Sequence, residues 1–381
     1  MKPIERFIIG KKKMMITEKN TYRWLCSCLV VGGMLLLSGC SGGSSGDDVP
    51  PSEQSYLQLG AVTRTDGAFG IPNATNPASN IQLFLATQTT LVEPVAGSTY
   101  SYSIDHWSSL TPFSVKENTQ YYLYGYMPAS ISATQSAPEG GYSNGMNLTL
   151  SNLPAITTDD VCVLVGVQRV GANPTGSPTV TEGQYGFLTG IKGQNYLNLL
   201  MAHLYAKMKV SFKIDPAYAE LRSIHLKKVT LTSKYANSVS VTVNLRSGQG
   251  IGSPTFPSGS EGAVEQTVTL LDTEKILDES FVTTPLTLDI PAYCRPMAGD
   301  GTYNLTLTTT YDVYDTKGSI LGEETSENEI KTERTSVNKV TLNMSEVRPG
   351  QEKVLVLTVM PTYLYVLSDN DADNPTISLG D

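Results

Sequence analysis

The stretch LYAKMKVSFKI, residues 204–214, carries the clearest pattern in the chain. Its apolar residues stand at every second position, and three lysines, a tyrosine and a serine fill the positions between them. Successive side chains of a β-strand point to opposite faces of a sheet. This alternation therefore predicts a strand with one buried face and one solvated face.

The same period of two recurs along most of the chain. The runs include Leu57-Leu59-Ala61, Ile81-Leu83-Leu85, Val239-Val241-Val243-Leu245, Tyr303-Leu305-Leu307 and Val340-Leu342-Met344. Residues 161–167 are instead apolar at nearly every position, which is typical of a central strand covered on both faces. Glycine, proline and serine gather between the runs, as in residues 248–262, and no stretch of twelve or more residues keeps a helical period. The sequence therefore predicts an all-β protein of the sandwich type.

Residues 1–39 differ from everything after them. A basic head is followed by an apolar stretch at residues 25–37, which is too short to span a bilayer comfortably and is typical of a signal peptide. The stretch ends Leu37-Ser38-Gly39-Cys40, which resembles the lipobox of bacterial lipoproteins. This resemblance implies that Cys40 carries acyl chains such as palmitate, which would anchor the exported protein to the outer membrane. Residues 40–55 are rich in Gly and Ser and are expected to form a flexible tether.

The charge and the length narrow the possible functions. The formal net charge is −9, and loss of the basic leader makes the rest of the chain still more acidic. Because an acidic surface repels phosphate backbones and no basic cluster offsets it, we exclude a nucleic acid partner. The length predicts two domains, which we place at residues 56–200 and 201–381, with a C-terminal appendage at about residues 351–381.

The sequence offers no constellation of residues for catalysis or for binding a cofactor or a metal. The three histidines lack the spacing of metal ligands, and His203 falls on the polar side of its alternating run, where an exposed or hydrogen-bonded side chain is expected. Residues 369–373 (DNDAD) resemble the start of a calcium loop, but Asn374 and Gly380 stand where that loop needs Gly and Glu. We therefore expect a protein that is not an enzyme and has no resident cofactor or metal.

Two cysteines follow Cys40 in the chain. Cys162 and Cys294 both lie in apolar, strand-like contexts. One disulfide between them and two separate buried thiols are both compatible with the sequence.

Four stretches, in this order, resemble the fimbrillins, the pilin family of gram-negative oral and gut anaerobes. They are the lipobox with its tether and a single strand that stops at Arg64, residues 122–128 (YLYGYMP), residues 200–208 (LMAHLYAKM), and residues 334–360 with their last strand, loop and appendage. The resemblance covers nearly all of the chain after the leader. One departure is that Pro361-Thr362-Tyr363 stands where the family's appendage often carries a tryptophan.

The resemblance implies two tandem transthyretin-like β-sandwich domains that assemble by strand exchange. An Arg-specific, trypsin-like protease would cut between Arg64 and Thr65 and so remove the lipid together with the first strand, which contains Leu57, Leu59 and Ala61. A donor strand from a neighbouring subunit would then fill the open groove. The candidate donor residues are Val354, Leu355, Val356, Leu357, Val359 and Met360. The other interpretation of residues 354–360 is an internal strand of the second sandwich.

The function implied by the resemblance is that of a structural subunit of a cell-surface pilus, or fimbria, that serves cell adhesion. Its partners would be other pilus subunits, in a homopolymer or a heteropolymer, together with the protease and, before processing, the outer membrane. The alternative is a surface lipoprotein that retains its lipid, either as a pilus anchor or as a module that binds a glycan or a host protein.

Overall fold

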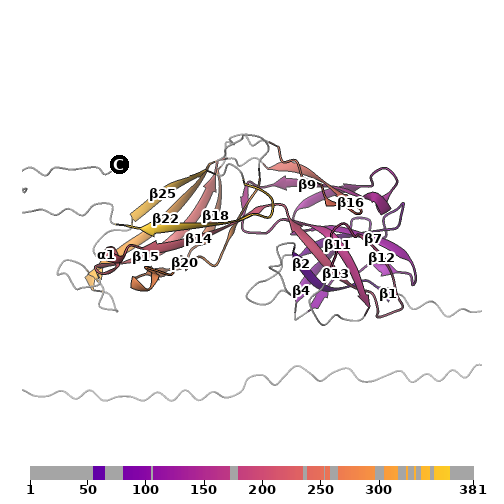
Figure 1. Cartoon of the computed structure of the whole chain (residues 1–381), viewed down its shortest axis with the longest axis horizontal. Helices are drawn as coiled ribbons and strands as arrows, with labels where there is room; N and C mark the ends of the chain where they lie inside the picture. The colour runs from indigo at the N-terminus through magenta and orange to yellow at the C-terminus, as the bar shows by residue number, and fades with distance from the viewer. Residues whose placement is uncertain are drawn as a thin grey trace, which may run out of the picture. The chain divides into compact units, whose positions relative to one another are not determined.

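The computed structural model describes residues 55–64, 80–103, 106–171, 179–234, 238–252, 254–257, 265–296, 304–315, 323–324, 330–331, 336–343 and 347–360 (Figure 1). The chain divides into two compact units, Met1–Ser52 and Glu53–Asp381, and every described residue belongs to the second unit. Cys40, Thr65 and residues 369–373 lie outside the described residues, and for Arg64 the description covers the backbone.

An eight-stranded sheet forms the first part of the described chain. Its strands lie in the order β2-β13-β11-β7-β3-β4-β5, with β12 paired to β7. They are β2 (Gln58–Arg64), β3 (Ile81–Ala86), β4 (Ser98–Ser103), β5 (His106–Ser108), β7 (Gln120–Met127), β11 (Cys162–Gly171), β12 (Gly186–Leu188) and β13 (Tyr196–His203). A two-stranded sheet pairs β1 (Ser55–Tyr56) with β6 (Ser114–Val115).

The eight-stranded sheet buries apolar side chains on both of its faces. Along β11, Cys162 and Leu164 belong to one buried cluster, the N-terminal core, whereas Val163 and Val165 belong to another, the middle core. The prediction of a strand covered on both faces at residues 161–167 is thus confirmed. The N-terminal core consists of Leu57, Leu59, Val62, Ile81, Leu83, Leu85, Tyr100, Trp107, Phe113, Val115, Tyr121, Leu123, Met127, Cys162, Leu164, Val167, Phe187, Leu197, Leu199 and Met201.

A four-stranded sheet covers the middle core. Its strands lie in the order β17-β16-β9-β8, with bounds β8 (Ser132–Ser136), β9 (Gly145–Leu153), β16 (Val239–Arg246) and β17 (Gly250–Ile251). Alternate residues of β9 and β16 point into this core, among them Leu148 and Leu150 from β9 and Val241 and Val243 from β16. A short 3-10 helix, Tyr142–Asn144, precedes β9.

Two further sheets enclose the third buried cluster, the C-terminal core. The five-stranded sheet has the order β10-β21-β14-β20, with β26 paired to β14, and the seven-stranded sheet has the order β18-β15-β22-β24-β23, with β19 on β15 and β25 on β22. Their strands are β10 (Ile156–Thr157), β14 (Ala206–Ile214), β15 (Arg222–Ser233), β18 (Gln266–Leu271), β19 (Lys275–Leu277), β20 (Leu286–Thr287), β21 (Ala292–Cys294), β22 (Asn304–Asp315), β23 (Glu323–Glu324), β24 (Ile330–Lys331), β25 (Ser336–Asn343) and β26 (Glu352–Val359).

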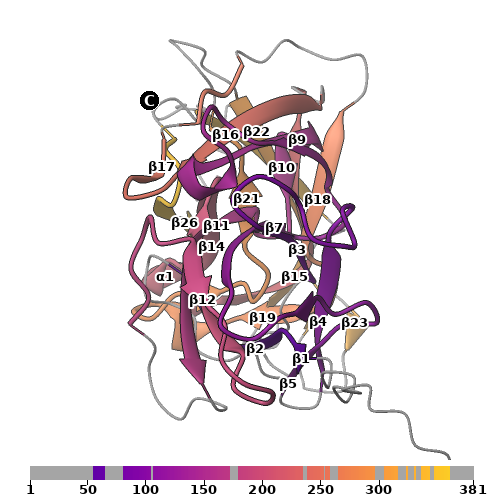
Figure 2. The same ribbon diagram turned by 90° about the vertical axis from the view of Figure 1, so that its right-hand side faces the viewer.

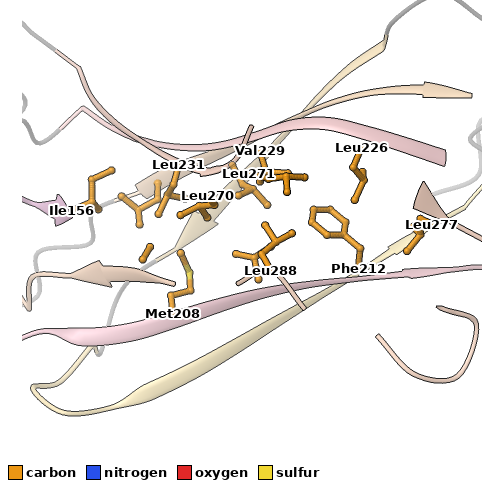
Figure 3. Packing of buried hydrophobic residues seen from close by; sticks show 14 of the residues in the cluster. Ile156, Met208, Phe212, Leu226, Val229, Leu231, Leu270, Leu271, Leu277 and Leu288 are labelled. Carbon is orange, nitrogen blue, oxygen red and sulfur yellow. The ribbon is translucent and has the colours of Figure 1, made fainter. Parts of the chain in front are cut away.

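Strand β14 contains residues 206–214 of the alternating run from which the fold was predicted. Met208, Val210, Phe212 and Ile214 are buried in the C-terminal core, and Figure 3 shows Met208 and Phe212 packed among the aliphatic side chains of that core. The helix α1 (Pro216–Ala219) follows β14, and a second 3-10 helix spans Glu279–Phe281. The all-β, sandwich-type fold predicted from the sequence is confirmed. Within the described part of the chain, no helix has the length and apolar character needed to cross a membrane.

Strands cross between the two halves of the described chain. β16 follows β15 in sequence but pairs with β9, and β10 pairs with β21. The guanidinium of the buried Arg295 donates to the carbonyl of Leu153 at 2.9 Å, and its backbone N–H donates to the carbonyl of Ala155 at 2.9 Å. Tyr205 adds a bond from its hydroxyl to the carbonyl of Pro154 at 2.6 Å. Because a buried polar group left without a partner is costly, these bonds hold residues 153–155 against the second half of the chain.

Candidate functional site

The N-terminal strand completes the N-terminal core. Leu57, Leu59 and Ala61 are only 2%, 5% and 7% exposed, and Leu57 and Leu59 pack within that core. The apolar side chains that alternate along residues 57–61 therefore point inward. Burial of a large aliphatic side chain stabilises a fold by roughly 1.5–3 kcal/mol, so this short segment contributes several kcal/mol to the domain that it joins.

Strand β2 lies at the edge of its sheet and runs parallel to β13. Leu59 is the register partner of Leu197, and Arg64 is the partner of Met201. The other pairs of the eight-stranded sheet are antiparallel. At a bulge in this pairing, the backbone N–H of Ala61 donates to the side-chain oxygen of Asn198 at 2.9 Å. Because β2 is an edge strand that precedes the other strands of its sheet in sequence, it can leave the sheet without displacing any of them.

The opposite side of this segment is also occupied. The backbone N–H of Leu57 donates to the carbonyl of Phe113 at 2.9 Å, just before β6, and β2 lies beside β5 (Figure 2). The segment therefore fills a slot between β13 and the β5–β6 region. Loss of the segment would uncover the apolar row beneath it and one edge of β13.

Arg64 is the last residue of β2 rather than the first residue of a loop. The sequence predicted a first strand from Tyr56 to Thr63, whereas β2 also includes Arg64, which is the register partner of Met201. Proteases prefer exposed loops to paired strands. Cleavage after Arg64 would therefore require the end of β2 to separate from β13 first.

The pKa of Tyr100 depends on whether the N-terminal strand occupies this slot. Its hydroxyl donates to the carbonyl of Leu57 at 3.4 Å, and burial raises the pKa of Tyr100 to about 12. An unfolded tyrosine ionises near pH 10. Because the folded state keeps the proton longer, this stabilisation is fully present below about pH 10 and is lost as the pH rises through about 12.

We expect Leu59→Asp to expel the strand and to lower the pKa of Tyr100 from about 12 towards about 10, because a buried carboxylate in this core is strongly disfavoured. Ultraviolet titration of the variant with and without Tyr100→Phe isolates this one phenol. Gln58→Asp, on the exposed side of the same strand, is the matched control and should leave the pKa raised. An unchanged pKa in Leu59→Asp would show that the strand does not cover Tyr100.

Strand β26 carries the candidate donor residues. It lies parallel to β14 over eight register pairs, from Lys207 with Glu352 to Ile214 with Val359. Leu355, Leu357 and Val359 pack against the C-terminal core, and the Glu352 carboxylate pairs with Lys209 at 2.9 Å. In this chain, residues 354–359 thus lie in a strand at the edge of the five-stranded sheet, paired with β14.

The outer face of β26 is apolar and exposed. Val354 is 57% exposed, Val356 45% and Met360 61%. The sequence, apolar at nearly every position of residues 354–360, predicted a strand covered on each side, but here the inner row alone is covered. β26 therefore presents aliphatic side chains that a further layer of protein would cover.

The remaining residues singled out in the sequence divide into separate clusters. His106 lies on β5, while the buried His225 contacts the Glu274 carboxylate at 2.7 Å. A hydrogen bond to Glu274 raises the pKa of Lys227, and the same bond lowers the pKa of Glu274. Both groups thus stay charged as a partly exposed surface ion pair, an arrangement that supplies neither a neutral amine nor a proton-bearing acid for catalysis.

The two cysteines are thiols in different cores. Cys162 lies in the N-terminal core and Cys294 in the C-terminal core. Burial raises the pKa of the Cys294 thiol to about 12, so almost none of it is the reactive thiolate at neutral pH. Of the two possibilities left open by the sequence, the structure has the buried thiols.

One cluster was missed in the sequence. His203 is buried, and its Nδ1 lies 2.9 Å from the carboxylate of Asp160 and 3.5 Å from Sγ of Cys162. Of the two expected arrangements for His203, exposed or hydrogen-bonded, the structure has the hydrogen-bonded one. Asp160 and Cys162 are two residues apart in the sequence, but His203 reaches them through strand pairing, which no local spacing reveals.

Comparison with known proteins gives structural neighbours alone. No family model and no curated protein sequence matches the chain. Among solved structures it is similar to a fimbrial protein of Bacteroides vulgatus, with 12% identity, a TM-score of 0.36, and 79% of this chain and 95% of that chain covered. It is similar to a protein of Bacteroides fragilis assigned to cell adhesion, with 12% identity, a TM-score of 0.34, and 80% and 89% covered.

A third similar structure is that of a fimbrial anchor protein of Porphyromonas gingivalis. The identity is 8%, the TM-score is 0.26, and 67% of this chain and 77% of that chain are covered. These three solved structures are fimbrial and cell adhesion proteins.

Proposed function

We propose that this chain is a structural subunit of a cell-surface pilus, exported as a lipoprotein on Cys40 and assembled by protease-triggered strand exchange. The observation that carries the proposal is the placement of the N-terminal strand. It is a parallel edge strand that buries Leu57, Leu59 and Ala61, and it continues into the rest of the chain through Arg64. A single cut there would turn an integral strand into a separate peptide.

The physical consequence of such a cut is an unsatisfied slot. Leu57 and Leu59 would leave apolar neighbours of the N-terminal core facing water, and β13 would lose the partner of its parallel ladder. A strand from another subunit restores both the side-chain burial and the backbone hydrogen bonds, as in donor-strand complementation. Three inward-facing aliphatic side chains of a donor strand would each stabilise the filled slot by roughly 1.5–3 kcal/mol, which offsets the burial that the donor loses when it leaves its own sheet.

The C-terminal strand fits the role of donor in spacing and in direction. Leu355, Leu357 and Val359 face inward at every second position, the same spacing as in Leu57, Leu59 and Ala61. Both strands run parallel to the partner that holds them, β14 for β26 and β13 for β2. Before donation, β26 must leave β14, and this requirement restrains premature assembly.

A second candidate function rests on the backbone of Arg64. Its pairing with Met201 inside the ladder favours resistance to proteolysis. A subunit that is not cut would keep its first strand and its lipid and would act at the outer membrane as a pilus anchor, or as a surface module that binds a glycan or a host protein.

Brief trypsin treatment of the folded protein separates these two functions. A pilus subunit should be cut first after Arg64 and should then form higher-order species that survive cold detergent. An anchor or binding module should stay monomeric after equal treatment. Sizing of the products on a detergent gel, with mass spectrometry of the new N-terminus, gives the answer.

Lipidation is tested independently at Cys40. We expect Cys40→Ala to abolish incorporation of labelled palmitate and to leave an unprocessed precursor, since acylation needs this thiol. Cys162→Ala, which removes a buried thiol further along the chain, is the control and should still be labelled. Continued labelling of Cys40→Ala would contradict the assignment of the lipidation site.

A further inference from the structure

The ends of two neighbouring strands bring three different metal-binding groups together. Asp160 lies just before β11, Cys162 is the first residue of β11, and His203 is the last residue of β13. Cys162 and His203 are register partners across the antiparallel pair. A carboxylate oxygen, a thiol sulfur and an imidazole nitrogen therefore converge by backbone pairing on a fixed frame rather than on a loop.

The distances suit a small tetrahedral ion. Nδ1 of His203 lies 2.9 Å from the Asp160 carboxylate and 3.5 Å from the Cys162 sulfur, and the three donor atoms all lie within 4.8 Å of one another. Ligands placed at ~2.1 Å from a tetrahedral ion are about 3.4 Å apart. The His203–Asp160 and His203–Cys162 spacings are thus within about 0.5 Å of that value, and the bound of 4.8 Å leaves the third spacing to close by up to about 1.4 Å.

The charges also suit a divalent ion. The three residues are 5%, 0% and 9% exposed, and a lone thiolate or carboxylate is costly at such depth. A divalent cation bound by one carboxylate and one thiolate forms a neutral group, and its binding would release the thiol proton to solvent. A cavity of about 300 Å³ is lined in part by Asp159 and Val161, the chain neighbours of Asp160.

We propose that Asp160, Cys162 and His203 bind one transition-metal ion of the Zn²⁺ class, with a fourth position open to water or a small ligand. Sulfur and imidazole together select zinc-like ions over Ca²⁺ or Mg²⁺. The ion would join the start of β11 to the end of β13, two residues beyond the Met201 that pairs with Arg64. This inference stands independently of the proposed role in a pilus.

Cobalt is the probe, because Co²⁺ takes tetrahedral zinc sites and absorbs visible light. The full chain, with Cys26, Cys28 and Cys40 replaced by serine so that Cys162 and Cys294 are its two thiols, is purified in detergent and stripped with a chelator. It should bind one Co²⁺ and develop ligand-field bands together with a thiolate-to-cobalt charge-transfer band. Added Zn²⁺ should bleach both. Cys162→Ser should remove the charge-transfer band, and His203→Gln should weaken Co²⁺ binding at least ~100-fold, because second-shell partners alone contribute 10–100-fold.

Cys294→Ser is the matched control, since it removes a buried thiol in another core and should leave the spectrum intact. If Cys162→Ser fails to fold, Cys294→Ser still identifies the thiol that binds cobalt. In Cys294→Ser, Cys162 is the thiol after Cys40 that remains to produce the charge-transfer band. The proposal is overturned if the wild-type chain shows no charge-transfer band, or if the band follows Cys294. It is equally overturned if His203→Gln, shown by circular dichroism to be folded, binds Co²⁺ as tightly as the wild type.

Discussion

Arg64→Ala is expected to abolish assembly and to leave folded monomers at the cell surface. Without a basic residue at this position, a trypsin-like protease has no bond to cut at the end of β2, so Leu57, Leu59 and Ala61 stay in their slot. The folded state should be affected little, because substitutions away from a core usually change stability by less than about 0.5 kcal/mol. Detergent-stable polymer on a gel, compared with the wild type, measures the effect.

The matched control for this variant is Arg64→Lys. Trypsin accepts lysine, so purified Arg64→Lys should still be nicked and should still polymerise in vitro. An Arg-specific protease would leave it uncut in cells, and polymer should then be missing there. Assembly of Arg64→Ala at the wild-type level would show that the switch lies elsewhere.

Locking β26 onto its own sheet is expected to stop growth without stopping cleavage. Lys209 and Val354 are register partners on neighbouring parallel strands, and both side chains are at least one third exposed. Neighbouring strands lie about 4.8 Å apart, within the range that a disulfide spans. Lys209→Cys combined with Val354→Cys should therefore form a disulfide that keeps β26 paired with β14 of its own subunit.

The reductant makes this test reversible. The oxidised double variant should be nicked at Arg64 and remain monomeric, and a thiol reductant should restore polymerisation to the level of the single variant Lys209→Cys. Cys162 and Cys294 should not interfere, because both are buried. Equal polymerisation of the oxidised and reduced forms would show that β26 is not the strand that is donated.

Local alternation predicted much of the fold and the inward row of the site. Residues 206–214 of the run at residues 204–214 form β14, the doubly apolar run at residues 161–167 lies largely in a strand between two cores, and Leu57, Leu59 and Ala61 are buried. These features follow from the period of a strand, which depends on nothing but neighbouring residues.

The features that escaped prediction depend on which strands meet. β16 pairs with β9 although nearly a hundred residues separate their sequences, and the period of a strand does not name its partner. Asp160, Cys162 and His203 converge for the same reason. The apolar run at residues 354–360 predicted hydrophobicity on both faces, but the covering of a face depends on a neighbour, and here one face has none among the described residues.

Mass spectrometry of the N-terminus in polymer isolated from cells shows whether the first strand is removed before subunits assemble. Assembled subunits are expected to begin at Thr65, because the strand that contains Leu57, Leu59 and Ala61 must leave before a neighbour's strand can enter. Assembled subunits that begin instead at an acylated Cys40 would contradict this expectation, since their first strand would still occupy the slot.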